Sequence, residues 1–519
     1  MPATQDATPA EEEEDAGGPG IDRDASRALR REIVDLVLGR RENSQLDAFL
    51  AARRPAEALA LWYGEAVLFL LAKGKQDGVR AALDRDIAAI DALLARQLDA
   101  VLHNPRFQAL EASWRGVRYL VEQLAEDDGL LLRILTLPWP ELCRDLERAN
   151  EFDQSSLFAK IYSEEFGMAG GKPYGFLVAD YAVCHRPSAK RRTDDVGALR
   201  SLAAIAAAAF SPIVIGAAPE LLGIESFAEL GHLLDVGAIF RDEEYRRWRG
   251  LQEMEEARFL GVALPRILLR TPYADQGGRR DGFRYREGRH GMRPTDYLWG
   301  NAAYAFAVIV GRAFRQSRWF AQIRGVPPEG AGGGVVEGLP PLPYETDRCQ
   351  LALRRPLEVE ITDSQEKVLG DHGFIALSPC RLSPLLAFLG NQSVQRPGPG
   401  APNASTVNGR LSAMLQYILC VSRFSHYVKV MVRDRIGEFT TAEAMETFLA
   451  RWLHGHTLGN DDASLEQKAR YPLREASVNI REIPGRPGAF SCIIHLRPHF
   501  QLDQVASSFR LHTEVMATQ

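Results

Sequence analysis

The stretch LEASWRGVRYLVEQL, residues 110–124, carries the clearest structural signal in this chain, because its apolar residues recur three and four positions apart. These residues are Leu110, Trp114, Val117, Leu120, Val121 and Leu124. The spacing predicts an amphipathic helix that packs one apolar face against a core. Charged residues lie on or near the margin of that face, and the Trp-Arg-Gly sequence at 114–116 is an unusual centre for such a helix.

The chain before this stretch is predicted to be helical after a disordered start. Residues 1–25 are acidic and rich in Gly, Pro and Thr, so they bury too little apolar surface to offset the entropy of ordering. Residues 26–40 are predicted to form an amphipathic helix, with Gly39 just past its end. Its apolar face consists of Leu29, Ile33, Leu36 and Val37. Residues 41–125 then form a helical N-terminal region.

Residues 126–345 are predicted to form a central α/β domain. The apolar runs 130–137 and 173–181 predict buried strands. The Ala-rich segment 196–210 predicts a helix, and residues 213–215 predict another strand. Strand, helix and strand in this order indicate an α/β fold with mixed sheets and some parallel pairing.

Residues 346–500 are predicted to form a C-terminal domain, followed by an arm at 501–519. A helix is expected at 411–435, and two alternating segments at 478–483 and 490–496 predict a hairpin. The arm alternates polar and apolar residues, which predicts a strand with Val505, Phe509, Leu511 and Val515 on one face. From the residues alone, this strand either forms an edge of its own sheet or pairs with a neighbouring subunit.

The composition indicates a globular protein without an obvious charged partner. The chain has 519 residues, 46% of them hydrophobic, and 62 Lys and Arg against 68 Asp and Glu. This balance does not call for nucleic acid or an anionic membrane surface. The six cysteines never form a Cys-x-x-Cys pair, and the N-terminus lacks a signal-peptide pattern. We therefore expect buried free thiols and a cytoplasmic location.

Motifs for catalysis or for cofactor binding are missing from the sequence. The histidine pairs 454/456 and 495/499 lack the spacing and companions of a metal site, and the glycine-rich loop at 327–336 lacks the Gly-Lys-Ser/Thr ending of a phosphate-binding loop. We expect no metal, no cofactor and no active site. An enzyme would need acid–base carboxylates assembled from distant positions. The candidates for such a site are Glu164, Glu165, Asp180, Asp194 and Asp195.

Six blocks in order carry a resemblance to a known family. They are LEASWRGVRYL from 110, FAKIYSEEFGMAGGKPYGFLVADY at 158–181, FLGVALPRILLRTPY at 259–273, YLWGNAAYAFA at 297–307, SRFSHYVKVMVRDRIGEF at 422–439 and LRPHFQLD at 496–503. They resemble the large subunit of the contractile sheath of the bacterial type VI secretion system, the TssC or VipB family. The long helical segment at 46–83 and the acidic tail indicate a divergent or paralogous branch of that family.

The resemblance implies a mechanical structural protein of the sheath type, not an enzyme. Its partners would be a small sheath subunit (TssB or VipA), further copies of itself in a helical lattice, an inner tube of Hcp, the baseplate and the recycling ATPase ClpV. The alternatives are the sheath of a related phage-tail-like injection particle and, less favoured, a cytoplasmic enzyme that uses the carboxylates above.

The resemblance also implies roles for three sets of residues. The helix bearing Leu29, Ile33, Leu36 and Val37 would bind the ATPase, although the same face could instead dock onto its own chain. The strand bearing Val505, Phe509, Leu511 and Val515 would pair between subunits. The basic residues Arg423, Lys429 and Arg433 are candidates for facing the tube; a solvated helix face or an intersubunit ion-pair surface is the alternative.

Overall fold

The computed structural model describes residues 45–124, 129–168, 170–189, 191–231, 235–274, 282–288, 291–327, 332–343, 353–380, 383–396, 412–435, 442–460, 462–482, 489–499 and 509–516. They divide into two compact units, which are described separately. The smaller unit comprises Met1–Asn104 and Pro272–Met292, and the larger unit comprises Pro105–Thr271 and Arg293–Gln519.

The smaller unit is helical over most of residues 45–102, as the apolar spacing predicts, and the described residues of 272–292 contain no helix. Its helices are α2 (Gln45–Ala51), α3 (Pro55–Tyr63), α4 (Ala66–Ala72) and the long α5 (Gln76–Leu102). A small core forms around Trp62, Tyr63 and Val67. The buried carboxylate of Asp86 on α5 accepts hydrogen bonds from Trp62 Nε1 at 2.8 Å and from Tyr63 OH at 2.9 Å. These bonds fasten α3 to the long helix.

The larger unit is built on a six-stranded mixed sheet, so the expected α/β fold is confirmed. The strand order is β1 (Leu177–Val183), β2 (Ile213–Ala217), β3 (Leu260–Leu264), β9 (Phe374–Pro379), β10 (Leu386–Phe388) and β6 (Val335–Val336). The first four strands run parallel, and β10 runs antiparallel to both β9 and β6. Strands β1 and β2 confirm two of the strands predicted from the sequence.

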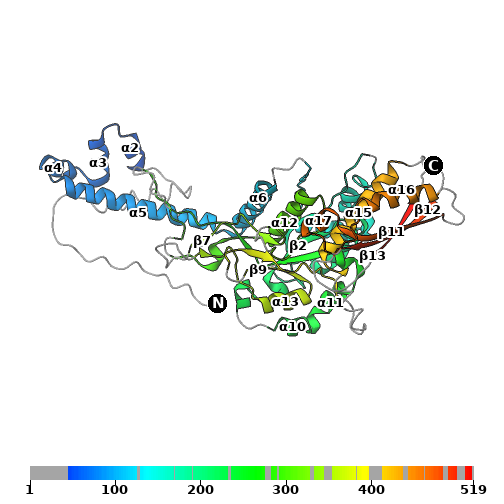
Figure 1. Cartoon of the computed structure of the whole chain (residues 1–519). Coiled ribbons are helices and arrows are strands. Elements are labelled where there is room, and N and C mark those ends of the chain that lie inside the picture. Colours follow the sequence, from blue (N-terminus) through cyan, green and yellow to red (C-terminus); the bar gives the residue numbers. More distant parts are fainter. Residues whose placement is uncertain are drawn as a thin grey trace. The chain divides into compact units, whose positions relative to one another are not determined.

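Helices cover both faces of this sheet. Along β2, Ile213 and Ile215 face one apolar core, while Val214 faces a second core on the other side. The first core contains residues of α7 (Trp139–Arg148), α9 (Asp195–Ala208), α11 (Arg246–Gln252) and α13 (Asp363–Asp371). The second contains residues of α6 (Pro105–Leu124), α12 (Ala302–Ser317) and the start of α15 (Leu415–Arg433). Figure 1 shows α12 and α13 on opposite sides of the sheet.

The C-terminal part of the larger unit has a second sheet. Strands β11 (Leu473–Glu482), β12 (Ala489–Pro498) and β13 (Phe509–Met516) are antiparallel, with β12 in the centre. Helix α15 and helix α16 (Ala442–His454) pack on it through a third apolar core. The predicted hairpin and helix are thereby confirmed. The remaining short α-helices and strands that the structure describes are α8 (Ser156–Phe158), α10 (Val236–Ile239), α17 (Leu465–Arg470), β4 (Ile267–Arg270), β5 (Leu298–Gly300), β7 (Leu342–Pro343) and β8 (Leu353–Arg354).

The Trp-Arg-Gly sequence on α6 is explained by three different environments. Gly116 lies against α12, where an added Cβ would come within 2.3 Å of the Tyr304 ring. Arg115 binds Glu111 at 2.7 Å, and Glu111 also accepts from the buried Arg270 at 2.9 Å. Trp114 points outward, with 64% of its surface exposed. The helix therefore packs through its small residue and its ion pairs as well as through its apolar residues.

Two sequence predictions about this region are wrong. The predicted apolar face of α6 is only partly buried: Leu120 and Leu124 are in the core, whereas Leu110, Trp114 and Val121 are exposed. The buried strand predicted at 130–137 is instead an unpaired, mostly exposed segment. Its apolar run is as long as a buried strand requires, but within the described residues no neighbouring strand pairs with it.

Replacing Gly116 by Ala should destabilise the protein, because the new Cβ meets the Tyr304 ring. We expect a loss of about 1–3 kcal/mol in the free energy of unfolding, as for other overpacked sites. Denaturant unfolding followed by tryptophan fluorescence measures this. Gly250→Ala on α11 is the matched control, since an added Cβ there has nothing within 4 Å, and it should be neutral or slightly stabilising. Equal stability of the two variants would contradict the packing argument.

Candidate functional site

The three basic residues predicted to face a tube lie along α15, and all three contact their own chain. The Arg423 guanidinium lies 4.4 Å from the centre of the Tyr427 ring and 5.2 Å from that of Phe314, and it donates to Tyr427 OH at 2.8 Å. Such stacking covers much of the charged group. The residue is half-buried and does not stand free on the helix surface.

Lys429 and Arg433 are held in the same way. The Lys429 ammonium lies 4.8 Å from the Phe166 ring centre and 4.9 Å from that of Phe210, and burial lowers the pKa of its amino group. Arg433 donates to the carbonyl oxygens of Phe166 at 3.3 Å and Met168 at 2.8 Å. These contacts explain the basic residues of α15 by packing within the chain. A tube-facing role for them stays a prediction.

His426, on the same helix, is buried in its neutral form. His426 Nε2 lies 2.9 Å from the carbonyl oxygen of Ala209, and because a carbonyl oxygen only accepts, this nitrogen is the donor. Burial lowers the pKa of His426 to about 4, and the nearby Arg423 and Lys429 add to the effect. This ring links α15 to the end of α9.

The terminal strand β13 contains three of the four residues predicted for pairing between subunits. Phe509, Leu511 and Val515 lie opposite Leu496, Ile494 and Phe490 of β12 in an antiparallel register. Within the described strands, β12 is the only partner of β13, which leaves β13 at the edge of its sheet. Val505 lies outside the described residues. The structure thus shows the strand and its register, while pairing between subunits stays a prediction.

The predicted ATPase-binding helix at 26–40 precedes the first described residue. Leu29, Ile33, Leu36 and Val37 all lie outside the described residues, as does the tail before them. Their role stays a prediction from the sequence.

The carboxylates considered for an active site serve separate structural purposes. Asp195 is buried and accepts from Trp139 Nε1 at 2.8 Å and from the Cys184 N–H at 3.0 Å. Asp194 caps α9 by accepting from the Gly197 N–H at 3.1 Å. Burial raises the pKa of Asp194, but Arg247 and this N–H outweigh burial and leave the pKa below its ordinary value.

Of the other three carboxylates, two are hydrogen-bonded within the chain and one is a surface residue. Glu165 accepts from the Lys172 N–H at 3.0 Å and pairs with Arg133, and Asp180 accepts from Ser113 at 2.5 Å. Glu164 is exposed, 3.9 Å from Lys160. The structure does not bring these residues together around a shared cavity, because each is bound to a different neighbour.

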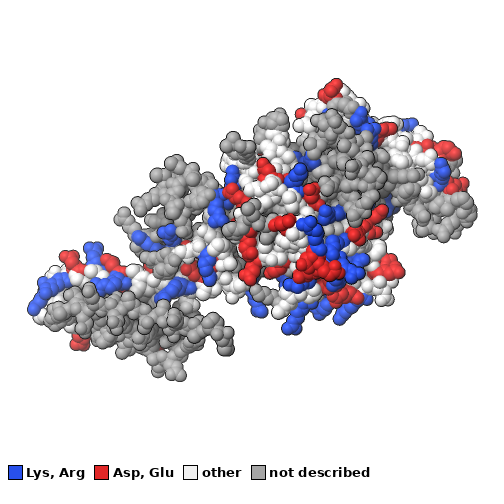
Figure 2. Space-filling model, turned by 90° about the horizontal axis from the view of Figure 1, so that it is seen from below, with Lys and Arg blue, Asp and Glu red and all other residues white. Residues whose placement is uncertain are grey.

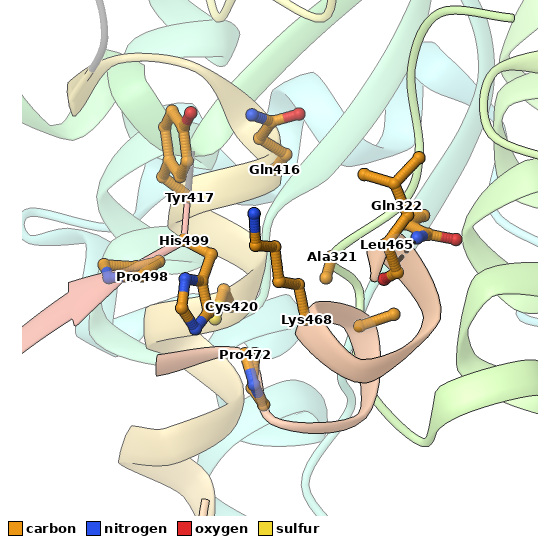
Figure 3. Close-up of a pocket in the computed structure, with 11 residues that line it drawn as sticks. Ala321, Gln322, Gln416, Tyr417, Cys420, Leu465, Lys468, Pro472, Pro498 and His499 are labelled. Atoms are coloured by element: carbon orange, nitrogen blue, oxygen red, sulfur yellow. Dashed lines mark hydrogen bonds between the residues drawn. The ribbon is translucent and has the colours of Figure 1, made fainter. Parts of the chain in front are cut away.

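A pocket of about 170 Å³ lies between α15, α17 and the end of β12 (Figure 3). Its polar lining includes Lys468, His499 and Cys420, and none of its lining residues is Asp or Glu. Burial raises the pKa of the Cys420 thiol to about 12, so the thiol is protonated and weakly nucleophilic at neutral pH. The pocket offers neither an activated nucleophile nor an acid–base pair.

Charge and metal-binding groups give no further site in the part of the chain that the structure describes. On the face seen in Figure 2, basic and acidic side chains are interspersed over the larger unit. No group of three or more His, Cys, Asp or Glu residues among the described ones is arranged to hold a metal ion. Of the helices described, none is both long enough and apolar enough to cross a membrane. Buried free thiols are confirmed at Cys143, Cys184, Cys420 and Cys492, whereas the free thiol of Cys380 is only partly buried, and Cys349 lies outside the described residues.

The most unusual surface was missed by the sequence analysis. It consists of the exposed apolar residues of α6 and those of the following segment at 130–137. The signal was present as a run of apolar residues, but a run of this kind does not reveal whether it is buried in its own chain or left for a partner. This surface points to a function in assembly.

Comparison with known proteins agrees with an assembly function. Residues 84–395 match the family model "EvpB/VC_A0108, tail sheath N-terminal domain", and residues 404–515 match "EvpB/VC_A0108, tail sheath gpW/gp25-like domain". The chain is thus a tail sheath protein. It is also similar to the type VI secretion system sheath protein TssC1 of Pseudomonas aeruginosa PAO1, with 36% identity over 463 residues, which are 89% of this chain and 91% of that protein.

The chain therefore belongs to the VipB (TssC) family and is a structural subunit of the contractile sheath of a type VI secretion system. The resemblance found in the six sequence blocks is confirmed. Membership of the family implies pairing with a small sheath subunit and assembly with further copies of the chain.

The buried neutral His426 should make the protein less stable as the pH falls. Its pKa is about 4 when folded and near 6.5 when unfolded, so between these values only the unfolded chain takes up the proton. The contribution of the neutral His426 to the free energy of unfolding is present in full above pH 7. It is lost as the pH falls towards 4, by roughly 3 kcal/mol in total. The unfolding midpoint measured from pH 4.5 to 7.5 should therefore fall more steeply in the wild type than in His426→Gln.

The exposed His454 provides the control. His454→Gln should keep the wild-type pH dependence. A wild-type slope in His426→Gln as well would show that the acid sensitivity comes from other groups.

Proposed function

We propose that this chain co-assembles with its small sheath subunit in the bacterial cytoplasm, as a helical tubule around an inner tube, and that β13 links neighbouring subunits. The observation that supports the link is the position of β13 as an eight-residue edge strand at the end of the described chain. Within the described strands β13 pairs with β12 alone, so it can leave this edge and pair with the same edge of a neighbour's sheet. The edge of β12 that β13 leaves would then pair with β13 of another subunit.

Main-chain pairing suits a sheath that must change shape. A ladder along eight residues holds two subunits together through backbone hydrogen bonds, which depend little on the details of the side chains. The subunits can rotate relative to one another while this connection stays intact. Links of this kind would keep the lattice continuous during contraction.

The energy of contraction is proposed to reside in the lattice itself. Two lattices of the same subunits differ in buried area and in charge pairing, and the extended one persists as a kinetic trap until the baseplate releases it. The tube inside would be an Hcp-like protein. Re-use of the subunits then requires an external motor, a ClpV-like ATPase that binds Leu29, Ile33, Leu36 and Val37 on the N-terminal helix.

A catalytic role is not proposed. The candidate carboxylates are bound to separate neighbours, and the pocket beside α15 contains a protonated thiol and no lining carboxylate. The relative TssC1 carries the name of a type VI secretion system sheath protein, which also favours a structural role over the enzyme alternative and over a phage-tail-like particle.

Replacing Leu511 by Pro should prevent tubule formation while leaving the pair with the small subunit intact. Leu511 lies opposite Ile494 inside the paired part of β13, where proline, which has no N–H and a fixed φ, is poorly tolerated. Both chains are co-expressed, the pair is purified by a tag on one of them, and tubules are counted by electron microscopy. Leu511→Val, which keeps the N–H and favours a strand, should form tubules as the wild type does.

Normal tubules from Leu511→Pro would refute the proposed strand link. Absence of tubules from the wild type with its small subunit would instead contradict the assignment as a sheath subunit.

Combining Leu29→Asp with Ile33→Asp should abolish binding of the recycling ATPase, because two carboxylates on the apolar face oppose its burial in a groove. A pull-down with the purified ATPase measures binding, and electron microscopy checks the tubules. Arg31→Ala, on the opposite face of the predicted helix, should leave binding unchanged. Loss of tubules in the double variant would show that this helix serves the fold or the lattice instead.

A further inference from the structure

Residues 130–137 are an apolar segment that their own chain leaves open. Six consecutive residues from Leu131 to Thr136 are exposed, with 65% of Leu131, 60% of Ile134 and 55% of Leu135 accessible. Side chains alternate between the two sides of an extended backbone, so apolar groups are open on both sides of this segment. Leucines scattered singly over a surface are ordinary, but a continuous run of this length marks an interaction site.

The backbone of this segment is open as well. Among the described residues, no hydrogen bond joins the N–H or C=O groups of 130–136 to another residue, and the one bond to the backbone of 130–137 is from Tyr181 OH to the Leu137 carbonyl at 2.6 Å. An extended chain with free donors and acceptors can accept a further strand. The segment therefore offers a partner both backbone groups for hydrogen bonding and apolar side chains for packing.

The segment belongs to a wider surface around β1. Strand β1 ends the six-stranded sheet, and within the described strands it pairs with β2 alone. Tyr181 of β1 holds the end of the segment, while Asp180 of β1 binds Ser113 on α6. Helix α6 adds an exposed apolar stripe, which we call the α6 stripe, formed by Phe107, Leu110, Trp114 and Val121.

The segment offers a partner little charge for electrostatic recognition. Arg133 is the one charged residue in 130–137. It pairs with Glu165 of its own chain, and its guanidinium lies 5.6 Å from the centre of the Tyr174 ring. A complementary partner is therefore an extended, uncharged, apolar strand, with no acidic group required to match Arg133.

We propose that residues 130–137 and the α6 stripe form the docking surface for an apolar strand of the small sheath subunit. The inference rests on the proposed co-assembly and specifies where the partner binds. Obligate partners meet through surfaces that resemble a protein core, whereas the contacts between copies, apart from the proposed β13 link, must break and reform when a lattice contracts. A surface as apolar as this one suits the permanent partner. Trp114 is the type of residue that dominates such interfaces.

Photo-crosslinking in assembled tubules identifies the occupant. A benzoylphenylalanine at position 134 should crosslink to the small subunit, and the same group at position 50 should not. Leu50 is 65% exposed, as Leu131 is, and lies on α2 of the smaller unit. A crosslink from position 134 to a second copy of this chain, or no crosslink from it, overturns the proposal.

Two substitutions test the mode of binding. Ile134→Asp places a charge in the apolar contact, and Thr136→Pro removes a backbone donor without altering the apolar side chains. Each should reduce the small subunit that co-purifies at least tenfold, whereas Leu50→Asp should retain it. Because these positions are exposed, circular dichroism and protease resistance of the full chain should be unchanged.

Wild-type binding by Ile134→Asp overturns the docking surface, and wild-type binding by Thr136→Pro overturns strand addition. The wild type should form tubules in the same experiment. If it does, either of these results counts against the docking surface and not against the assignment as a sheath subunit.

Discussion

The close approach of α6 to α12 is the constraint on which much of the larger unit depends. Gly116 lies where any side chain would enter the Tyr304 ring, so only one side of α6 can face α12. That choice places Leu120 and Leu124 in the core and directs Trp114 outward. The pair Glu111–Arg270, at 2.9 Å and largely buried, holds the helix in the same orientation. Loss of one partner from such a pair costs more than the pair itself contributes. The packing of one glycine therefore determines which apolar residues remain available for a partner.

Helix α15 connects the two sheets of the larger unit. Leu415 and Leu419 near its start belong to the core beneath the six-stranded sheet, whereas Phe424 and Val428 belong to the core beneath the three-stranded sheet. Arg423 and Lys429 on this helix lie over aromatic rings, so the helix can be basic and still be largely enclosed by protein. A load applied to β13 would reach the six-stranded sheet through this helix, which suits a subunit that transmits force through a lattice.

A sheath subunit must be stable alone for long enough to meet its partners and must still keep surfaces for them. In this chain the two needs are met by different residues: the cores around the six-stranded sheet are closed, while the edge of β13 and residues 130–137 are open. Unpaired strand edges and exposed leucines promote aggregation in a protein that remains monomeric. They are useful in a protein whose normal state is an assembly.

The amino-acid sequence by itself determined the α/β class, the main helices and strands such as 196–210 and 490–496, and the family, because periodicity and ordered motifs are local properties of the chain. It did not determine burial. The run at 130–137 has the composition of a buried strand, and the basic residues of α15 have the pattern of a charged face, yet the fold exposes the first and encloses the second. Only the tertiary structure decided these points. Whether a residue is covered depends on neighbours that are distant in the chain, such as Phe166 for Lys429 and Tyr304 for Gly116.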